Sequence, residues 1–125
     1  MRGTLIGHWV YLIGIGAAVG ARFLPALADA RVTPSPELRI MVPLLAVVAL
    51  LDYALSLWLE GHLRARGPQG EAAFPIVTAA FGVSIAVYGM VTWFLGASGS
   101  SFWAFAGLAL FHWVHSAVRW SSLRP

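Results

Sequence analysis

The amino-acid sequence predicts an all-α integral membrane protein, a four-helix transmembrane bundle with both termini in the cytoplasm. The first observation behind this prediction is composition. Of the 125 residues, 59% are hydrophobic and only 10% are charged, and the mean hydropathy is +0.78. Soluble domains average about 25% charged residues, which cover the surface that faces water. The charged residues of this chain are too few to do so, and we therefore expect lipid to solvate much of its surface.

The second observation is a series of four long apolar stretches, at residues 5–24, 40–59, 74–95 and 102–120. Each is close to the roughly 20 residues that a helix needs to cross the hydrocarbon core of a bilayer. Only helices and closed barrels satisfy their backbone polar groups in lipid. Because the stretches are continuously apolar and do not alternate with polar residues, we expect helices. Residues 1–125 are thus predicted to form a single transmembrane domain.

The third observation is the character of the segments between these stretches. Residues 28–39 carry charges and two prolines, residues 60–72 carry charges and a Gly–Pro pair, and residues 97–101 read Ala-Ser-Gly-Ser-Ser. Such residues mark turns, and the shortness of the last segment predicts that the final two spans are antiparallel neighbours. The first apolar stretch is longer than the apolar region of a secretory signal and has no clear cleavage site. It is predicted to be a retained first span.

Arginines give the expected orientation, because cytoplasmic segments of membrane proteins carry an excess of basic residues. With the N-terminus inside, five arginines fall on the cytoplasmic side and three on the opposite side. The first group is Arg2, Arg64, Arg66, Arg119 and Arg124, and the second is Arg22, Arg31 and Arg39. This modest bias predicts a multi-pass protein of the cell (cytoplasmic or inner) membrane, partnered by the lipid bilayer. It leaves dual topology open.

Composition also excludes several kinds of function. The chain has no cysteine, which excludes disulfides, thiolate metal sites and catalytic thiols. Its eight basic residues against five acidic ones are spread along the chain, whereas nucleic-acid binding needs a basic patch. The short loops leave no room for a soluble catalytic domain, so we expect no catalytic activity from the chain by itself. No metal site is predicted, since too few further ligands accompany the histidines.

Small residues predict close helix packing. Gly16 and Gly20 form a Gly-xxx-Gly pair in the first span, and Gly82 and Ala86 form a looser version in the third. This spacing lets helix backbones approach closely in a membrane. The sequence leaves open whether the packing partner lies within the chain or in another subunit.

Ionisable residues at membrane depth are the candidate functional groups, because they are costly in lipid and usually mark a pathway or a ligand. At about 1.5 Å of rise per residue, Asp52, Ser84 and His112 share one level near the midplane. On the same basis His115 lies about 6 Å and His8 about 10 Å towards the cytoplasm. These depths bring the polar residues of all four spans within about half of the bilayer.

A proton or ion pathway is the first interpretation of these residues. His112 and His115 are three residues apart and therefore lie on roughly one helix face. If that face meets Asp52, the resulting His–carboxylate pair can hold and pass a proton near neutral pH. The predicted pathway consists of Asp52, Ser84, Tyr88 and His112. A structural polar contact between helices is the alternative.

A cofactor site is the second interpretation. His8 and His115 lie on different spans at similar depths, which is the arrangement of a bis-histidine b-type haem. The predicted cofactor-binding residues are His8, His112 and His115, and the candidate cofactors are haem b and quinone.

The leading functional hypothesis is a small polytopic subunit of a larger membrane complex or homo-oligomer, with an intramembrane His/Asp site for haem, quinone or proton handling in electron transport. One alternative is a small proton-coupled transporter or channel that uses Asp52. Another is a purely structural or assembly subunit, in which the polar residues hold helices together.

Overall fold

The computed structural model describes residues 2–122 of the chain. Within this part the protein is all-helical, as predicted, and has no strand. Arg124, one of the arginines assigned above to the cytoplasmic side, lies outside the described residues. The described part contains five helices: α1 (Arg2–Ala21), α2 (Pro25–Asp29), α3 (Leu38–Arg64), α4 (Pro68–Phe94) and α5 (Gly99–Ser121).

Three of these helices, α1, α3 and α4, are long and apolar enough to cross a membrane. They indicate a membrane protein, in agreement with the composition. Helix α5 has 23 residues and a single charged residue, Arg119, but is not among the three. Its serine, histidine and tryptophan residues lower its hydropathy below that of the other long helices.

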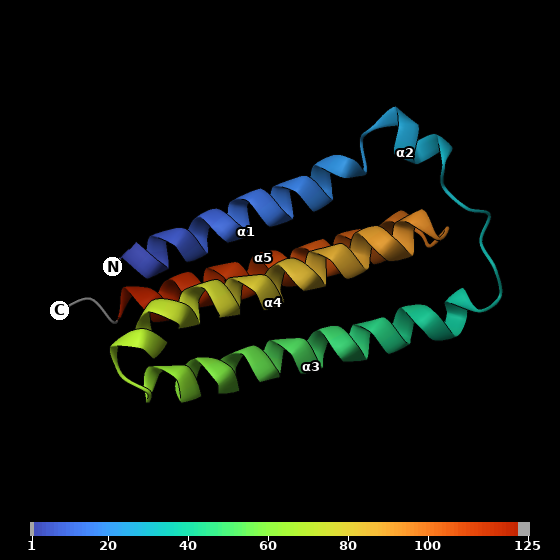
Figure 1. The fold of residues 1–125 in the computed structure, drawn as a ribbon. Helices are drawn as coiled ribbons and strands as arrows, with labels where there is room; N and C mark the ends of the chain where they lie inside the picture. Colours follow the sequence, from blue (N-terminus) through green and yellow to red (C-terminus); the bar gives the residue numbers. More distant parts are fainter. Residues whose placement is uncertain (1, 123–125) are drawn as a thin grey trace.

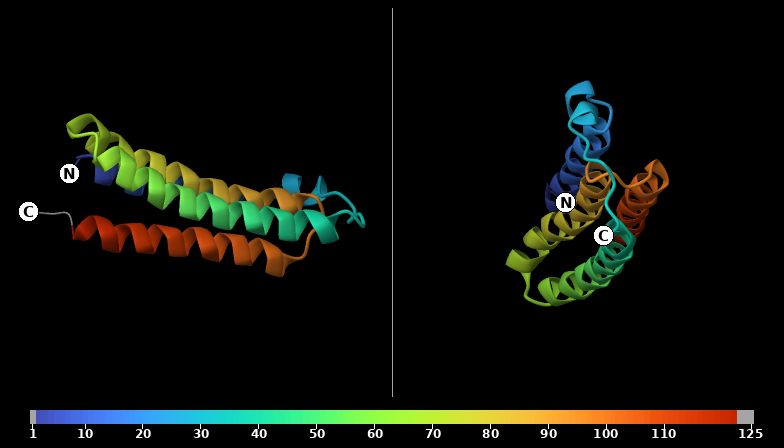
Figure 2. Two further views of the ribbon diagram at one scale, coloured as in Figure 1. Left: turned by 90° about the horizontal axis from the view of Figure 1, so that it is seen from below. Right: turned by 90° about the vertical axis from the view of Figure 1, so that its right-hand side faces the viewer.

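The four long helices run side by side (Figure 1). Helix α4 contacts each of the other three, and α1 and α3 lie on opposite sides of it. Helices α4 and α5 pack together and run in opposite directions (Figure 2). The start of α1, the end of α5 and the connection 65–67 lie at one end of the molecule, here called the termini end (Figure 1). The connection containing α2 and the turn before α5 lie at the other end, here called the far end.

The turns at the two ends follow from local sequence. At the termini end, Gly67 has a positive φ of 84° and Pro68 occupies the first turn of α4. Glycine adopts positive φ without strain, and proline suits a helix start because its missing N–H has no helical partner there. The connection is shorter than the predicted 60–72, since α3 continues to Arg64 and α4 begins at Pro68. At the far end, the Ser98 side chain caps α5 by accepting from the Ser101 backbone N–H at 3.4 Å.

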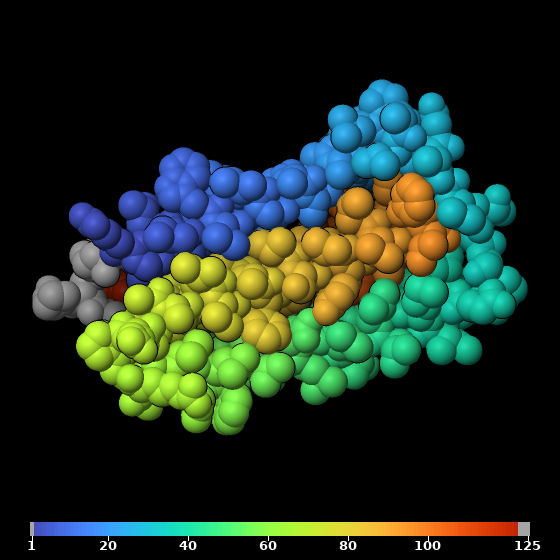
Figure 3. All heavy atoms as spheres, in the orientation of Figure 1, coloured from blue at the N-terminus to red at the C-terminus, as the bar shows by residue number. Residues whose placement is uncertain are grey.

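Small residues on α4 allow its neighbours to approach closely. A Cβ at Gly82 would lie 2.4 Å from Tyr11 Cε1, and one at Gly89 would lie 2.6 Å from Phe105 Cβ. On the visible face of the molecule α4 fills the space between α1 and α3 (Figure 3). The packing face predicted for the first span, at Gly16 and Gly20, contacts no other helix among the described residues. A Cβ at either glycine would meet nothing within 4 Å.

Candidate functional site

A hydrogen-bonded cluster of polar side chains joins the four long helices in the half of the bundle nearer the termini end. All but one of its members are buried, with exposed fractions of 0–4%, and the exception is Arg119, with 25% of its side chain exposed. We call this cluster the polar network. It consists of Tyr11 on α1, Ser56 and Glu60 on α3, Thr78 on α4, and His112, Ser116 and Arg119 on α5.

His112 lies at the centre of the polar network, and both of its ring nitrogens are hydrogen-bonded. Its Nδ1 is 2.6 Å from the hydroxyl of Tyr11, and its Nε2 is 2.8 Å from Oγ of Ser56. The Tyr11 hydroxyl also lies 3.0 Å from Oγ of Ser116, one turn along α5 from His112. The absence of a side chain at Gly82 makes room for this arrangement, since a Cβ there would lie 2.7 Å from His112 Nδ1.

The Tyr53 carbonyl fixes the directions of these bonds for a neutral His112. The Ser56 hydroxyl donates to the Tyr53 backbone carbonyl at 2.7 Å, so Ser56 accepts from Nε2–H of His112. Nδ1 of the neutral ring then accepts from the Tyr11 hydroxyl, and Tyr11 accepts from the Ser116 hydroxyl. Ser116 Oγ also accepts a 2.9 Å hydrogen bond from Arg119 Nη2.

An ion pair completes the polar network at the termini end. Glu60 Oε2 lies 2.8 Å from Arg119 Nη1, and it also accepts a 3.1 Å hydrogen bond from the Thr78 hydroxyl. A buried carboxylate needs a partner because it loses its hydration. Here both the charge and a further lone pair of Glu60 are satisfied by residues from two other helices.

Asp52 does not form the expected pair with a histidine. Its Oδ2 accepts a 2.5 Å hydrogen bond from the Tyr88 hydroxyl, which joins α3 to α4. The physical reason is helix rotation: each residue turns the helix by about 100°. Asp52 therefore faces α4, whereas Tyr53, the next residue, faces α5. Two of the predicted pathway residues, Asp52 and Tyr88, thus meet each other but not His112.

Ser84, which the sequence places at the same depth as Asp52, is separate from both groups. Its hydroxyl donates to the backbone carbonyl of Ala80, one turn earlier in its own helix, at 2.9 Å. This bond satisfies the serine within α4 and adds no link to another helix.

The other two predicted cofactor-binding histidines lie on opposite sides of α5. His115 Nδ1 is 2.6 Å from the Tyr53 hydroxyl of α3, whereas His8 on α1 accepts a 3.0 Å hydrogen bond from Trp113 Nε1. Residues 113 and 115 are about 200° apart around the helix axis. His8 and His115 therefore cannot face one ligand, and the residues present do not fit the predicted bis-histidine haem. Among the described residues no group of three or more His, Cys, Asp or Glu side chains could hold a metal ion.

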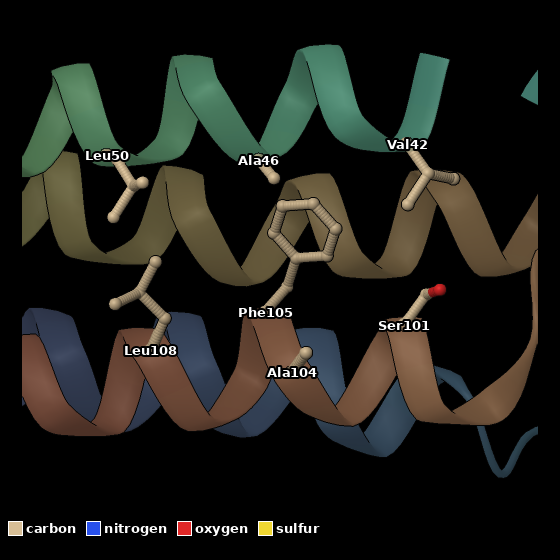
Figure 4. A pocket seen from close by; sticks show the side chains of 7 residues that line it. All are labelled: Val42, Ala46, Leu50, Ser101, Ala104, Phe105 and Leu108. Carbon is tan, nitrogen blue, oxygen red and sulfur yellow. The ribbon is translucent and has the colours of Figure 1, made fainter. Parts of the chain in front are cut away.

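Two apolar grooves flank α5 in the half nearer the far end. One lies between α3 and α5 and has a volume of about 250 Å³ (Figure 4). Its walls are formed by Val42, Ala46, Leu50, Ser101, Ala104, Phe105 and Leu108. The other lies between α1 and α5 and has a volume of about 370 Å³. Neither groove is lined by a histidine or a charged side chain.

Of the polar network, only His112 belongs to the site predicted from the sequence. Ser56, Thr78 and Ser116 are absent from the predicted site, because small hydroxyl residues are common in packed membrane helices and carry no signal alone. Their spacing does offer a signal, because Ser56 and Glu60 are four residues apart on α3 and His112 and Ser116 are four residues apart on α5. Paired polar residues at this spacing share a helix face.

Fold and site together define the class of protein as an all-helical one, in which helices able to cross a membrane surround a buried polar network. Comparison of the chain with protein-family models, with curated proteins and with solved structures gave no match. Its function must therefore be inferred from the geometry of the network itself.

Proposed function

We propose that this chain is a small multi-pass membrane protein of four spans, with both termini in the cytoplasm, that works within a larger membrane complex or as a homo-oligomer. We further propose that its polar network takes up and releases a proton at His112. The hydrogen-bonded chain from Ser116 through Tyr11 and His112 to Ser56 is the observation that carries this proposal.

The assignment of α5 as the fourth span rests on its length and its outer face. Its 23 residues extend for about 35 Å, enough for a hydrocarbon core of about 30 Å. Its exposed large apolar side chains are spread along the helix, and lipid is the solvent that suits such a surface. These side chains are Trp103, Leu110, Phe111, Val114 and Val118.

The proton-handling proposal rests on the chemistry of the four linked groups. A serine hydroxyl, a tyrosine hydroxyl and a neutral imidazole can each donate and accept a hydrogen bond. A proton that moves along such a chain reverses each bond in turn. Histidine is the member of the chain whose neutral side chain accepts an extra proton most readily. Well-packed apolar residues often stabilise a protein just as much as buried polar residues do. Ionisable groups at this depth are therefore better explained by a functional role than by stability.

Proton uptake after a rapid pH change tests this proposal. The protein is reconstituted into liposomes that contain a pH-sensitive dye, and uptake per chain is followed in time. We expect His112→Gln to remove one proton of uptake and Tyr11→Phe to slow uptake by interrupting the chain. Tyr53→Phe is the matched control, because it removes the same kind of hydroxyl from outside the chain. Identical uptake in wild type, His112→Gln and Tyr11→Phe contradicts the proposal.

A structural role is the second candidate, and a specific observation favours it. The network residues are partnered with one another and together join all four long helices, as an interhelix contact requires. In this case His112→Gln and Tyr11→Phe reduce thermal stability or assembly and leave proton uptake and flux unchanged. The transporter alternative instead predicts proton flux that is lost in Asp52→Asn, which removes the charge beside Tyr88.

Haem b and quinone remain candidates of the sequence hypothesis, and the positions of His8 and His115 disfavour the haem. Absorption spectra of the purified protein, first air-oxidised and then reduced with dithionite, test haem directly. A Soret band that shifts on reduction and is lost in His115→Ala or His8→Ala would restore the redox hypothesis. A spectrum with only the tryptophan band removes haem.

A further inference from the structure

A second polar feature lies at the far end, away from the polar network. The Arg22 guanidinium, just after α1, lies in a cage of four aromatic rings. Its central carbon is between 5.0 and 5.6 Å from the ring centroids of Phe23, Trp93, Phe102 and Trp103. Such rings attract the positive charge through their faces. They also displace water from part of the guanidinium without offering an oxygen acceptor.

The donors of Arg22 have no acceptor among the described residues. Its Nε is buried without a hydrogen-bond partner. The only ion pair among residues 2–122 joins Arg119 to Glu60, so Arg22 is paired with no carboxylate there. A guanidinium carries five N–H donors. Arg31, the neighbouring arginine at this end, differs because it donates to the backbone carbonyls of Trp93 and Ala97. The N–H groups on its two terminal nitrogens, which are not among the buried unpartnered atoms, are therefore the donors that Arg22 can offer to a group outside the chain.

The surroundings of Arg22 are positive as well. Its Nη2 lies 3.0 Å from the position that a Cβ would occupy on Gly99, the first residue of α5. The N-terminus of a helix carries a partial positive charge, and the first turn of α5 contains no acidic residue. A cation placed there is unfavourable unless an anion accompanies it.

The apolar groove between α1 and α5 begins at the same place. Its walls are Leu12, Ile15, Gly16 and Val19 of α1, and Trp103, Ala106, Gly107, Leu110 and Trp113 of α5. Trp103 belongs both to this groove and to the aromatic cage of Arg22. A Cβ at Gly16 or Gly107 would meet nothing within 4 Å, which shows that the groove stays open at these glycines.

We infer that this region binds an anionic phospholipid, with its phosphate at Arg22 and the start of α5 and one acyl chain in the α1–α5 groove. Phosphate is a strong acceptor for guanidinium and for helix N-termini, and basic pockets between membrane helices bind lipid headgroups. Charge complementarity identifies the occupant. A helix of a second copy would fill the groove but leave Arg22 without an anion. The site shares no residue with the polar network, and its test is independent of the proton proposal.

Native mass spectrometry of the full chain in detergent tests this inference. The protein is titrated with phosphatidylglycerol and with phosphatidylcholine of the same acyl chains. We expect the first phosphatidylglycerol to bind about tenfold more tightly, because both lipids offer a phosphate but the choline cation of phosphatidylcholine is repelled by the positive charge at this end. Arg22→Gln should abolish this preference, whereas Arg39→Gln, which changes an exposed arginine at the same end, should leave it intact. Arg22→Lys should retain part of it.

The groove is tested separately. Gly107→Leu should weaken phosphatidylglycerol binding by filling the groove, whereas Gly20→Leu, at an equally open glycine outside the groove walls, should not. Equal affinity of the wild type for the two lipids, or an unchanged preference in Arg22→Gln, overturns the inference. A protein dimer that is lost in Gly107→Leu, without any phosphatidylglycerol preference, overturns it in favour of a helix from a second copy. Circular dichroism and thermal unfolding check that each variant is folded, and Arg22→Lys replaces Arg22→Gln if the latter is not.

Discussion

His112 shows how strongly one residue can depend on its neighbours. It is fully buried, and both ring nitrogens are bound by side chains from two other helices, Tyr11 on α1 and Ser56 on α3. A buried polar group that loses its partner retains the desolvation penalty without the compensating bond. The polar network is therefore sensitive to removal of a single hydroxyl.

Tyr11→Phe should destabilise the fold by about 1–3 kcal/mol, because it leaves His112 Nδ1 without a partner in a buried site and removes one of the two side-chain bonds of Ser116. Tyr53→Phe should cost less, since Tyr53 and His115 are only partly buried. Unfolding of both variants by denaturing detergent measures the difference. Equal stability of Tyr11→Phe and the wild type would show that the hydrogen bonds of Tyr11 contribute nothing to the fold.

Glycine substitutions should separate close packing from open surface. Gly82→Ala places a Cβ 2.4 Å from Tyr11 and 2.7 Å from His112, and should cost about 1–3 kcal/mol through overpacking. Gly107→Ala meets nothing within 4 Å and should be neutral or slightly stabilising, because alanine is the better helix former. Thermal unfolding in detergent gives both values. A neutral Gly82→Ala would contradict the close approach of α1, α4 and α5.

At the scale of helices, α5 is attached to its neighbours in two different ways. Near the termini end, polar side chains join α5 to α1 and α3. Near the far end two apolar grooves separate α5 from these same helices. Helix α4 contacts all three other long helices and holds the bundle together along its length. Loss of the polar links should therefore loosen α5 rather than α4.

The ion pair between α3 and α5 provides a direct test. Arg119→Met leaves Glu60, only 4% exposed, as an uncompensated buried charge, and should destabilise the fold by about 3 kcal/mol. Replacing both residues with methionine should cost less than Arg119→Met alone, because no buried charge remains. A double-mutant cycle by thermal unfolding measures the coupling. Additive effects of the two changes would exclude a significant interaction between Glu60 and Arg119.

At the scale of the whole molecule, the start of α1, the end of α5 and the α3–α4 connection lie at one end (Figure 1). The chain has no natural cysteine, so single cysteines can report which side of a membrane each end faces. We expect an impermeant maleimide added to intact cells to label Ala30→Cys and Ser100→Cys at the far end. Gln69→Cys and Ser122→Cys at the termini end should be labelled only after permeabilisation. Labelling of all four from outside would indicate dual topology.

Helical class and helix positions follow from the sequence to a large degree. Continuous apolar runs require backbone groups to bond within the same segment, and the Gly–Pro and serine-rich segments end them. The predicted stretches 40–59, 74–95 and 102–120 fall within or almost within α3, α4 and α5. Helix ends differ by several residues, because polar residues such as Glu60 and Arg64 continue a helix beyond its apolar part. Helix α2 was not predicted, since its five residues lie across the boundary between the first apolar stretch and the polar segment 28–39.

Helix rotation, by contrast, was decided by tertiary structure alone. The sequence determined that this protein is helical and apolar and that Asp52, Ser84 and His112 share one level, because rise per residue is a property of the helix itself. Only the tertiary structure determined that Asp52 meets Tyr88 and that His112 meets Tyr11 and Ser56. The direction in which a side chain points depends on which face each helix turns towards its neighbours. Packing sets this rotation at residues such as Gly82, which is far along the chain from Tyr11 and His112, the residues it brings together.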